Sequence, residues 1–423
     1  MLSIEYIRKN IDKVKSAIKN KGYPSVDFDK FLKLDDERKK KSQKIQLLRQ
    51  ELNTLSKKGI DNSTKVTNKQ TRALIQQEEK KLKEIDQEFN KLLLQIPNIP
   101  EEGVPLGKDD SENKIIKTWG EIQKFDFIPK DHLELGENLD IIDVKTASKV
   151  SGTRFGYLKK ESVILEFALV QYAFNLLIKE GFIPIIPPVL INKDITEQLG
   201  YWHGGGNEDY YWVSEPNLKD EEHKGFYLVG TAEHSLVPMH KDDTLNLKNL
   251  PLRYVGFSTS FRREAGSYGK DTRGIFRVHQ FDKVEMVSYV QDEDDKKEHD
   301  YLLSLEEKLF QSLNIPYQVT QMCTGDLGFP IASKYDINAW IPSQNKYREV
   351  TSVSTTTDFQ ARRLNIKYQD GPEKKYVHIL NGTAFAIGRT IIAILENFQQ
   401  KDGSIKVPEI LHKYTGFKEI SKS

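Results

Sequence analysis

The sequence is almost free of cysteine, since Cys323 is the only one in 423 residues. A single thiol cannot form an intrachain disulfide, which excludes a disulfide-stabilised fold and fits a reducing compartment. Cys323 has no histidine at a spacing that would pair with it, so we expect a small buried residue rather than a nucleophile. Zinc-type spacings of Cys and His are absent, as is an HExxH pattern, which argues against a protein-bound transition metal.

Long hydrophobic runs are missing as well. No apolar run reaches the roughly 18 residues that a membrane-spanning helix needs, and the most apolar stretch, 181–191, is interrupted by prolines. Residues 1–10 place Glu5, Arg8 and Lys9 where a signal peptide has its apolar core. We therefore expect a cytoplasmic protein with no membrane partner.

Charge of one sign is not in excess. The 63 Lys and Arg residues nearly balance the 62 Asp and Glu residues, for a formal net charge of +1. A surface for nucleic acid would therefore have to be a local basic stripe. The acidic run 292–295, followed by Lys296 and Lys297, predicts the solvated start of a helix. The length predicts two or three domains at roughly 100–200 residues each.

The N-terminal region has the spacing of helices. Residues 4–19 carry apolar side chains at helical intervals and predict one short amphipathic helix that ends near Gly22 and Pro24. From 28 to 96, apolar residues follow alternating steps of three and four in two segments, the pattern of a coiled coil. The positions are Phe31, Leu34, Ile45, Leu48, Leu52 and Leu55, with Arg38 and Lys41 in two further slots, and then Ile75, Leu82, Ile85, Phe89, Leu92 and Ile96, with Glu78 in one.

A polar break between the two segments carries the turn-forming residues Gly59, Asp61, Asn62 and Ser63. The sequence thus predicts an antiparallel hairpin of two helices, each about 30 residues or roughly 45 Å long. Its lysines are compatible with an arm that reaches along a nucleic acid, although glutamates are interleaved with them. A dimerisation coil or a plain solvated helix pair fits the pattern equally well, and the pattern leaves these alternatives open.

Prolines at 97, 100 and 105 mark a linker, and we place the domains at 1–105 and 106–423. The second domain alternates short β-rich runs with helices. Helices are expected at 163–179 and 390–398, and strands around 183–191, 227–229, 252–257 and 284–289. Separated strands and helices of this kind predict an α+β fold with a largely antiparallel sheet.

Three stretches of the second domain point to a chemistry. They are a helix end that runs into a proline-bearing strand at 181–188, the sequence FRRE at 261–264 with a Gly-rich loop and RVHQF at 277–281, and Gly388-Arg389 at the start of an apolar helix. In order and form they resemble the three signature motifs of class II aminoacyl-tRNA synthetases. That resemblance implies the class II antiparallel sheet flanked by helices.

Within that class the chain resembles seryl-tRNA synthetases, over nearly its whole length and including the hairpin. The resemblance rests on TAE at 231–233, FRREAGSYGKDTRGIFRVHQFDKVE at 261–285, CTGDLGF at 323–329, TDFQARRLNI at 357–366 and LNGTAFAIGRT at 380–390. The implied activity is the ATP-dependent activation of serine to seryl-adenylate and transfer of the seryl group to the 3′ end of serine tRNA. Selenocysteine tRNA is an open second substrate.

Activation brings a carboxylate to the α-phosphorus of ATP, so two anions must meet and the site needs cations and a metal more than an acid or base. The resemblance implies that Arg262 holds the α-phosphate and the serine carboxylate and that Arg389 holds the γ-phosphate, which makes these two the catalytic residues. Glu264 would bind the adenine amino group and Phe281 would stack on the ring. The implied ATP-binding set is Arg262, Arg263, Glu264, Val278, Phe281, Glu349, Val350, Thr351, Ser352 and Arg389.

Glu349 and Ser352 match the family's positions for Mg²⁺, an ion that takes few protein oxygens beside those of a phosphate. No other cofactor is expected. The segment 353–357 departs from the family pattern, because it lacks the cysteines that many members carry there and has Thr355 where asparagine is common. This departure puts the fine positioning of ligands along that strand in question.

For serine, the implied binding set is Thr231, Ala232, Glu233, Arg262, Glu285, Asn381 and Thr383. Glu233 with Thr231 would bind the ammonium group, while Glu285, Asn381 and Thr383 would surround the hydroxyl. A pocket built to hydrogen-bond a hydroxyl rejects alanine, because the analogue leaves buried polar groups unpaired. Threonine must be excluded by its size.

The resemblance also implies a homodimer with the first motif at the interface. The hairpin of one subunit would grip the long variable arm of a tRNA held in the other subunit's active site, reading shape more than base sequence. Two alternatives are a ligase that loads an amino acid onto a carrier protein and a catalytically silent paralogue that binds RNA. The first would lack the long hairpin, and the second would not need Arg262, Glu264, Glu285 and Arg389 together.

Overall fold

The computed structural model describes residues 1–57, 62–202, 206–213, 225–265 and 273–422. They form two compact units, one of residues 1–19 and 23–97 and the other of residues 20–22 and 98–423. The turn predicted at Gly59 and Asp61 lies outside the described residues, as does most of the Gly-rich loop that follows FRRE.

The first unit begins with two helices where the sequence predicted one. α1 (Ile4–Lys9) and α2 (Ile11–Asn20) are separated by Asn10, which leaves the helical region of backbone conformation. The backbone N–H and the side-chain amide of Asn10 both donate to Tyr6 O at 3.0 Å, and its own carbonyl accepts from Val14 N. Asn10 therefore ends one helix and starts the next, the competition with helical backbone that short polar side chains bring.

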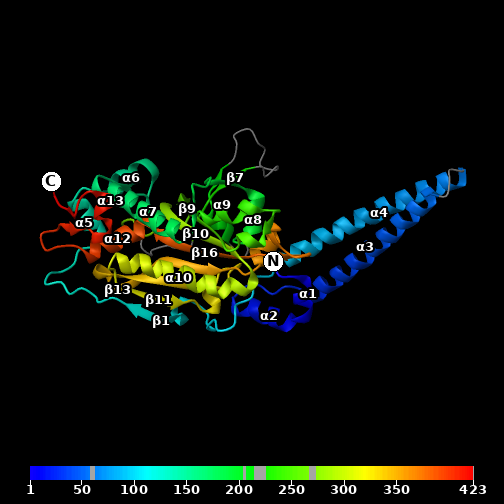
Figure 1. The fold of residues 1–423 in the computed structure, drawn as a ribbon, viewed down its shortest axis with the longest axis horizontal. Coiled ribbons are helices and arrows are strands. Elements are labelled where there is room, and N and C mark those ends of the chain that lie inside the picture. Colours follow the sequence, from blue (N-terminus) through cyan, green and yellow to red (C-terminus); the bar gives the residue numbers. More distant parts are fainter. Residues whose placement is uncertain (58–61, 203–205, 214–224, 266–272, 423) are drawn as a thin grey trace. The chain divides into compact units, whose positions relative to one another are not determined.

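The predicted hairpin consists of α3 (Phe28–Lys57) and α4 (Asn62–Leu93), which lie side by side (Figure 1). Ion pairs link Lys30 to Glu88 and Arg49 to Glu79, so the helices run antiparallel. Phe31 and Phe89 are both fully buried and stack with ring centroids 4.8 Å apart. The alternating steps of three and four in the sequence therefore form the seam between the helices, as coiled-coil packing requires.

Polar residues in the seam of the hairpin form ion pairs between the two helices. Glu78 is buried, and its two carboxylate oxygens accept from Lys41 and Lys44 on the facing helix. The Arg38 guanidinium lies over the Phe89 ring at 4.4 Å and pairs with Asp86 at 3.1 Å. A buried polar pair favours one alignment of two apolar helices over its alternatives, so these slots specify the register of the hairpin.

The second unit is built on an eight-stranded sheet, and the sequence predicted its largely antiparallel character but not its number of strands. Its strand order is β1 (Lys114–Trp119), β11 (Tyr317–Gln321), β12 (Ser333–Ile341), β13 (Lys346–Thr355), β16 (His378–Ala386), β10 (Gln280–Val290), β9 (Leu252–Phe261) and β4 (Ile183–Ile185). All neighbours are antiparallel except β4 and β9. The predicted strand at 183–191 is divided into β4 and β5 (Leu190–Asn192), because Pro187 and Pro188 cannot continue a ladder.

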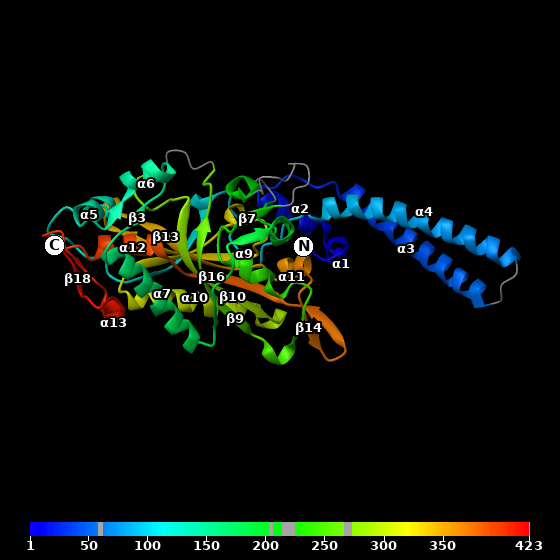
Figure 2. The ribbon, with the colours of Figure 1, turned by 90° about the horizontal axis from the view of Figure 1, so that it is seen from above.

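Three helices cover one face of this sheet and close the core. They are α7 (Glu161–Lys179), α10 (Asp295–Ser312) and α12 (Ile387–Asn397), and all three contact β16. Figure 2 labels the three helices and β16. On this face the Phe385 ring of β16 contacts Tyr172 of α7 and Phe310 of α10. The helices predicted at 163–179 and 390–398 are thereby confirmed. On the opposite face, part of the central strands carries a second apolar cluster with Tyr254, Val287 and Tyr289, and the rest lines the cavities described below. This second part is called the open face.

Smaller elements complete the second unit. β5, β7 (Phe226–Leu228) and β6 (Trp212–Val213) form one small sheet, and β8 (Thr244–Asn246), β14 (Lys367–Asp370) and β15 (Glu373–Tyr376) form another. β2 (Ile142–Asp143) pairs with β3 (Tyr157–Leu158), and β17 (Ile405–Lys406) with β18 (Glu419–Ile420). The remaining helices are α5 (His132–Asn138), α6 (Val144–Ser151), α8 (Lys193–Leu199), α9 (Glu233–Leu236), α11 (Phe359–Leu364) and α13 (His412–Thr415).

α7 is more apolar than the sequence analysis anticipated. By length and composition alone it would be long and apolar enough to cross a membrane. Its inner face, with Leu165, Leu169 and Leu177, is fully buried in the core of the second unit. The outer face exposes Ile164 and Phe167. The helix is therefore a core element with a second apolar surface, and that surface needs a separate explanation.

The acidic run 292–295 was expected to be solvated, and this prediction is wrong for Asp295. Its carboxylate is buried and accepts from the Thr355 hydroxyl at 2.8 Å and from His378 Nδ1 at 2.7 Å. A buried charge needs such partners, and here they connect the start of α10 to β13 and β16. Thr355, the departure from the family pattern, therefore faces the helices rather than the open face of the sheet.

The Asp295–His378 pair should make stability depend on pH. Burial by itself lowers the pKa of His378, but the hydrogen bond and charge of Asp295 raise it more, and the net pKa lies above its usual value. Because the folded pKa is raised, the stabilisation is complete below the unfolded pKa of about 6.5 and is lost as pH rises through the folded pKa. We expect His378→Asn to lower the melting temperature most near pH 6 and progressively less toward pH 9, as measured by calorimetry.

The control for this prediction is His412→Asn, since the His412 imidazole contacts the Val407 carbonyl at 2.9 Å and, within the described ranges, pairs with no carboxylate. A difference between wild type and His378→Asn that stays constant over the same pH range would contradict the assignment of charge to this pair.

Candidate active site

The open face of the sheet holds two adjoining cavities. Cavity A has a volume of about 210 Å³ and is lined by Arg262, Glu264, Phe276, Phe281, Glu349, Ser352 and Arg389, among others. Cavity B, of about 320 Å³, is lined by Tyr201, Thr231, Glu233, His234, Asn381 and Ser354, among others. Arg262, Lys283, Lys334 and Ser352 line both. The two cavities therefore share a wall of three cations and a hydroxyl.

A bulge in β13 brings two of the predicted residues to one face. Ile337 pairs with Thr351 and Asn338 with Glu349, so Val350 is an extra residue in β13. In a regular strand, residues three positions apart point to opposite faces. The bulge shifts this alternation by one, and Glu349 and Ser352 both line cavity A. Thr351, between them, turns its hydroxyl to Glu306 on α10 at 2.7 Å.

A second bulge shapes β16 in the same way. Glu285 of β10 pairs with Thr383 and Val284 pairs with Phe385, which leaves Ala384 as the extra residue. Phe385 can therefore point into the core, although Thr383, two residues earlier, points into cavity A. The bulge also precedes α12, whose first turn carries Arg389. Each bulge thus changes which side chains of its strand point into cavity A.

The two predicted catalytic arginines come together. Arg262 and Arg389 both line cavity A, from the end of β9 and the start of α12. Arg262 Nε donates to Gly230 O at 3.1 Å, and its guanidinium lies 5.4 Å from the Phe281 ring. Arg389 donates to a carboxylate oxygen and to the carbonyl of Glu349, both at 3.0 Å. Each side chain is held by neighbours yet keeps donors that can bind an anion.

Glu349 stays ionised beside these cations. Burial would raise its pKa, but Arg389, Lys334 and Arg262 outweigh that effect and lower the pKa to about 2. Its carboxylate together with the Ser352 hydroxyl offers two oxygens of the kind that Mg²⁺ prefers. Within the described residues, no group of three or more His, Cys, Asp or Glu side chains could hold a metal ion alone. A magnesium ion here would depend on phosphate oxygens for its other ligands.

The other predicted ATP-binding residues divide into two groups. Glu264, Val278, Phe281, Val350 and Thr351 line cavity A, and Glu264 accepts from Arg277 at 2.8 Å. Glu264 has a φ of 52°, an unusual backbone conformation for a residue with a β-carbon and one that functional sites often retain. Arg263 does not line the cavity, because its side chain is exposed and its backbone N–H donates to Asp209 O.

Cavity B contains the predicted ammonium-binding residues. Glu233 accepts a short hydrogen bond from the Tyr201 hydroxyl, and the buried Lys283 ammonium lies 3.3 Å from the Thr231 hydroxyl. Asn381 lines the cavity, and its buried amide nitrogen has no partner among the described residues. A buried donor without a partner is costly unless a ligand supplies the acceptor.

Two predicted serine-binding residues are less accessible. Glu285 is buried beneath Lys283, with which it pairs at 2.6 Å, and it accepts from the Thr383 hydroxyl at 3.3 Å. Ala232 is fully buried in an apolar cluster with Leu236 and contributes no side chain to either cavity.

Lys283, Lys334 and Tyr201 were missed by the sequence analysis. Lys283 could have been found from the sequence, because it precedes Glu285 by two positions on a strand and must share its face. Lys334 lies 3.1 Å from Asp336 and belongs to β12, whose position next to β13 only the sheet order reveals. These cations suit a site that receives anions, and the acids of cavity B suit a ligand with an ammonium group.

Comparisons with known proteins find similar sequences over nearly the whole chain. Residues 1–100 match the family described as the seryl-tRNA synthetase N-terminal domain, and residues 211–398 match the class II tRNA synthetase core domain (G, H, P, S and T). The serine–tRNA ligase of Thermodesulfovibrio yellowstonii is 42% identical over 99% of this chain and 100% of the relative.

Two solved structures are similar over nearly their whole length. The seryl-tRNA synthetase of Pyrococcus horikoshii, complexed with ATP, has a TM-score of 0.89 at 40% identity and covers 100% of both chains. The cytoplasmic serine–tRNA ligase of Naegleria fowleri, in complex with AMP, has a TM-score of 0.85 at 31% identity, with 99% of this chain and 97% of that one covered.

Glu233 should make ligand binding in cavity B depend on pH. Burial, with the nearby charge of Glu285, raises the pKa of Glu233 to about 7. An ammonium group binds the carboxylate and not the neutral acid, so affinity should fall roughly tenfold for each pH unit below about 7. We expect calorimetric titration with serine, the ligand that the sequence motifs predict, to show this loss and proton release on binding near pH 6.

The matched control is Glu233→Gln, which keeps the size of the side chain without its charge. Its affinity for serine should be weaker and should not vary between about pH 5.5 and 7.5 through this group. An unchanged pH dependence in Glu233→Gln would contradict the assignment.

Proposed function

The chain belongs to the seryl-tRNA synthetase family, and we propose that it activates serine with ATP to form seryl-adenylate and transfers the seryl group to the 3′ end of serine tRNA. The observation that carries this proposal is that Arg262 and Arg389 line one cavity beside the ionised Glu349, while Glu233 and Thr231 line the adjoining one. Triphosphate and amino acid can thus lie next to each other, with Arg262 at their junction.

In the activation step, a carboxylate oxygen of serine attacks the α-phosphorus of ATP and forms a new P–O bond. The bond between the α-phosphorus and the oxygen that bridges to the β-phosphate breaks, and pyrophosphate leaves. Arg262 lines both cavities, so it reduces the repulsion between the serine carboxylate and the α-phosphate. Arg389 binds the outer phosphates, and Phe281 supports the adenine ring. No general base is needed because the nucleophile is already a carboxylate, and catalysis rests on position and charge.

Glu349 and Ser352 are the residues that would hold Mg²⁺, and both line cavity A. The bound ion would neutralise phosphate charge and orient the leaving pyrophosphate. The low pKa of Glu349 supports this assignment, because the carboxylate is available as a ligand at any physiological pH.

Selection of serine follows from the polar residues at the junction of cavities A and B and directly behind it. Lys283, Glu285 and Thr383 form a connected network of polar contacts, and the Asn381 amide nitrogen, on the wall of cavity B, has no partner among the described residues. Serine can complete this network through its hydroxyl, whereas alanine leaves buried groups unpaired. Glu233 binds the ammonium and fixes the direction of the side chain.

We propose that residues 1–105 form a tRNA-binding domain and residues 106–423 the catalytic domain. The hairpin at 28–96 would contact the long variable arm of the tRNA, and the match of residues 1–100 to the family's N-terminal domain supports this role. A carrier-protein ligase would not need such an arm. Selenocysteine tRNA remains a second candidate substrate.

We also propose a cytoplasmic homodimer that does not bind membranes. Large apolar side chains are exposed on α7 and β4, two elements in contact, and on the chain from β4 into β5: Ile164, Phe167, Ile183, Ile186 and Leu190. Soluble proteins rarely leave such a patch uncovered, and the first signature motif contributes all of β4 to it. A second copy of the same surface would bury these residues symmetrically.

The activity can be tested by serine-dependent exchange of pyrophosphate into ATP, with threonine and alanine in parallel. We expect exchange with serine only.

Replacing residues 45–75 with a short Gly/Ser turn shortens the hairpin between two facing seam positions. If the arm contributes about 2–3 kcal/mol to tRNA binding, aminoacylation should fall roughly hundredfold while exchange is unchanged. Unchanged aminoacylation would contradict the role of the arm.

The dimer can be tested with Phe167→Glu, which places a charge on the exposed apolar patch. We expect analytical ultracentrifugation to show dimers for wild type and monomers for this variant, because burying an unpaired charge at an interface is costly. Val66→Glu is the control, since Val66 is equally exposed but lies on the hairpin. A monomeric wild type at micromolar concentration would refute the proposal.

A further inference from the structure

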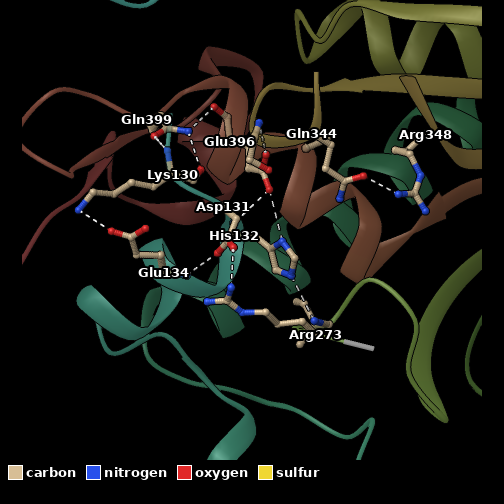
Figure 3. Close-up of polar contacts among 12 residues, drawn as sticks. Lys130, Asp131, His132, Glu134, Arg273, Gln344, Arg348, Glu396 and Gln399 are labelled. Carbon is tan, nitrogen blue, oxygen red and sulfur yellow. Dashed lines mark hydrogen bonds and ion pairs between the residues drawn. The ribbon is translucent and has the colours of Figure 1, made fainter. Parts of the chain in front are cut away.

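A buried histidine outside both cavities connects two elements that carry active-site residues. His132 is the first residue of α5 and is 5% exposed. Its Nδ1 lies 3.3 Å from a carboxylate oxygen of Glu396 on α12, and its Nε2 lies 3.3 Å from the backbone nitrogen of Ile275 (Figure 3). Both ring nitrogens are therefore used, each toward a different part of the chain.

The protonation of the ring follows from its partners. Glu396 is fully buried and accepts backbone N–H groups from His132 and Ser343, each at 3.0 Å. In the parts of the chain that the structure describes, no lysine or arginine pairs with Glu396. The proton of the neutral imidazole is thus best placed on Nδ1, toward the carboxylate. Nε2 is then an acceptor, as the Ile275 N–H requires.

The residue before Ile275 adapts to the imidazole. Gly274 has a φ of 76°, and a β-carbon at this position would lie 2.1 Å from His132 Nε2. Only glycine fits this conformation and this contact together. The backbone at Gly274 and Ile275 therefore packs directly against the imidazole, just before the chain reaches cavity A at Phe276.

The residue after Ile275 reaches the catalytic arginine. Phe276 lines cavity A, and its ring lies between two guanidinium groups, that of Arg348 at 4.2 Å and that of Arg389 at 4.9 Å. Cation–π contacts of this kind restrict where a guanidinium can rest. Arg389 lies in the first turn of α12 and Glu396 in its last turn. The contacts therefore form a closed chain that runs from Arg389 through Phe276, Ile275 and His132 to Glu396 and back along α12.

We propose that His132 is a positioning residue for ATP in the activation reaction: held by Glu396, its imidazole fixes Ile275 and thereby the Phe276 ring against which Arg389 rests. The inference rests on the proposed function and concerns the nucleotide alone. Cavity B is not lined by any member of this closed chain of contacts. Disturbing His132 should therefore affect ATP and leave serine binding intact.

The test compares His132→Leu with His132→Gln in the full-length protein. Leucine removes the acceptor for the Ile275 N–H, whereas glutamine can place an amide oxygen near the position of Nε2. For His132→Leu we expect kcat/KM for ATP in pyrophosphate exchange to fall about 10- to 100-fold, the range typical of partners that orient a binding group, with KM for serine changed by less than about twofold. His132→Gln should recover most of the loss, and His412→Leu should resemble wild type.

Equal changes in the ATP and serine parameters, or a glutamine variant as impaired as the leucine variant, would reduce His132 to a purely structural role and overturn the proposal. Gly274→Ala provides a second route that does not depend on the folding of His132→Leu, because its methyl group displaces the imidazole. In this variant kcat/KM for ATP should fall while KM for serine changes by less than about twofold, and equal changes in both parameters would also overturn the proposal. Serine-dependent exchange by wild type tests the proposed function separately.

Discussion

The single extra residue at Val350 is the constraint on which cavity A depends. It turns Glu349 to the same face as Ser352 while Thr351 still reaches α10, so one strand serves the site and the core together. Glu349 then meets Arg389, Lys334 and Arg262, whose charges keep it ionised. Without the bulge, the carboxylate would point toward the helices, and Arg389 would lose the ion pair that holds its guanidinium.

Buried charge of both signs is the second feature of the site. Burial raises the pKa of Glu233 and of Asp336 to about 7 and that of Glu306 well above its usual value. Lys283 and Lys334 are placed among these acids and pair with Glu285 and Asp336. Burying these charges costs desolvation free energy. In return, the site is already arranged to bind a ligand that carries both an ammonium and an anionic group. A free amino acid such as serine carries both an ammonium and a carboxylate.

Local patterns predicted much of this molecule. Seam positions such as Phe31 and Phe89 follow the 3.5-residue period of packed helix pairs, and the break between the two segments predicts a hairpin. The prolines and alternating runs of the second domain predict its strands. The motif residues Arg262, Glu264 and Arg389 were identified by resemblance, and the structure brings them to one cavity. Asn10 and Asp295 were misjudged because their roles depend on hydrogen bonds to residues that spacing does not reveal.

By itself the sequence determined the two-helix hairpin, the α+β class and the family, because each depends on periodicity or on residues close together in the chain. Only the tertiary structure decided that Arg263 and Ala232 contribute no side chain to the cavities, that Lys334 does, and that His132 connects α12 to the chain beside Phe276. These outcomes depend on strand order, on two bulges and on contacts between residues more than a hundred positions apart. The spacing of residues along the sequence does not reveal such contacts. They form only when the folded chain brings together residues that are far apart in the sequence.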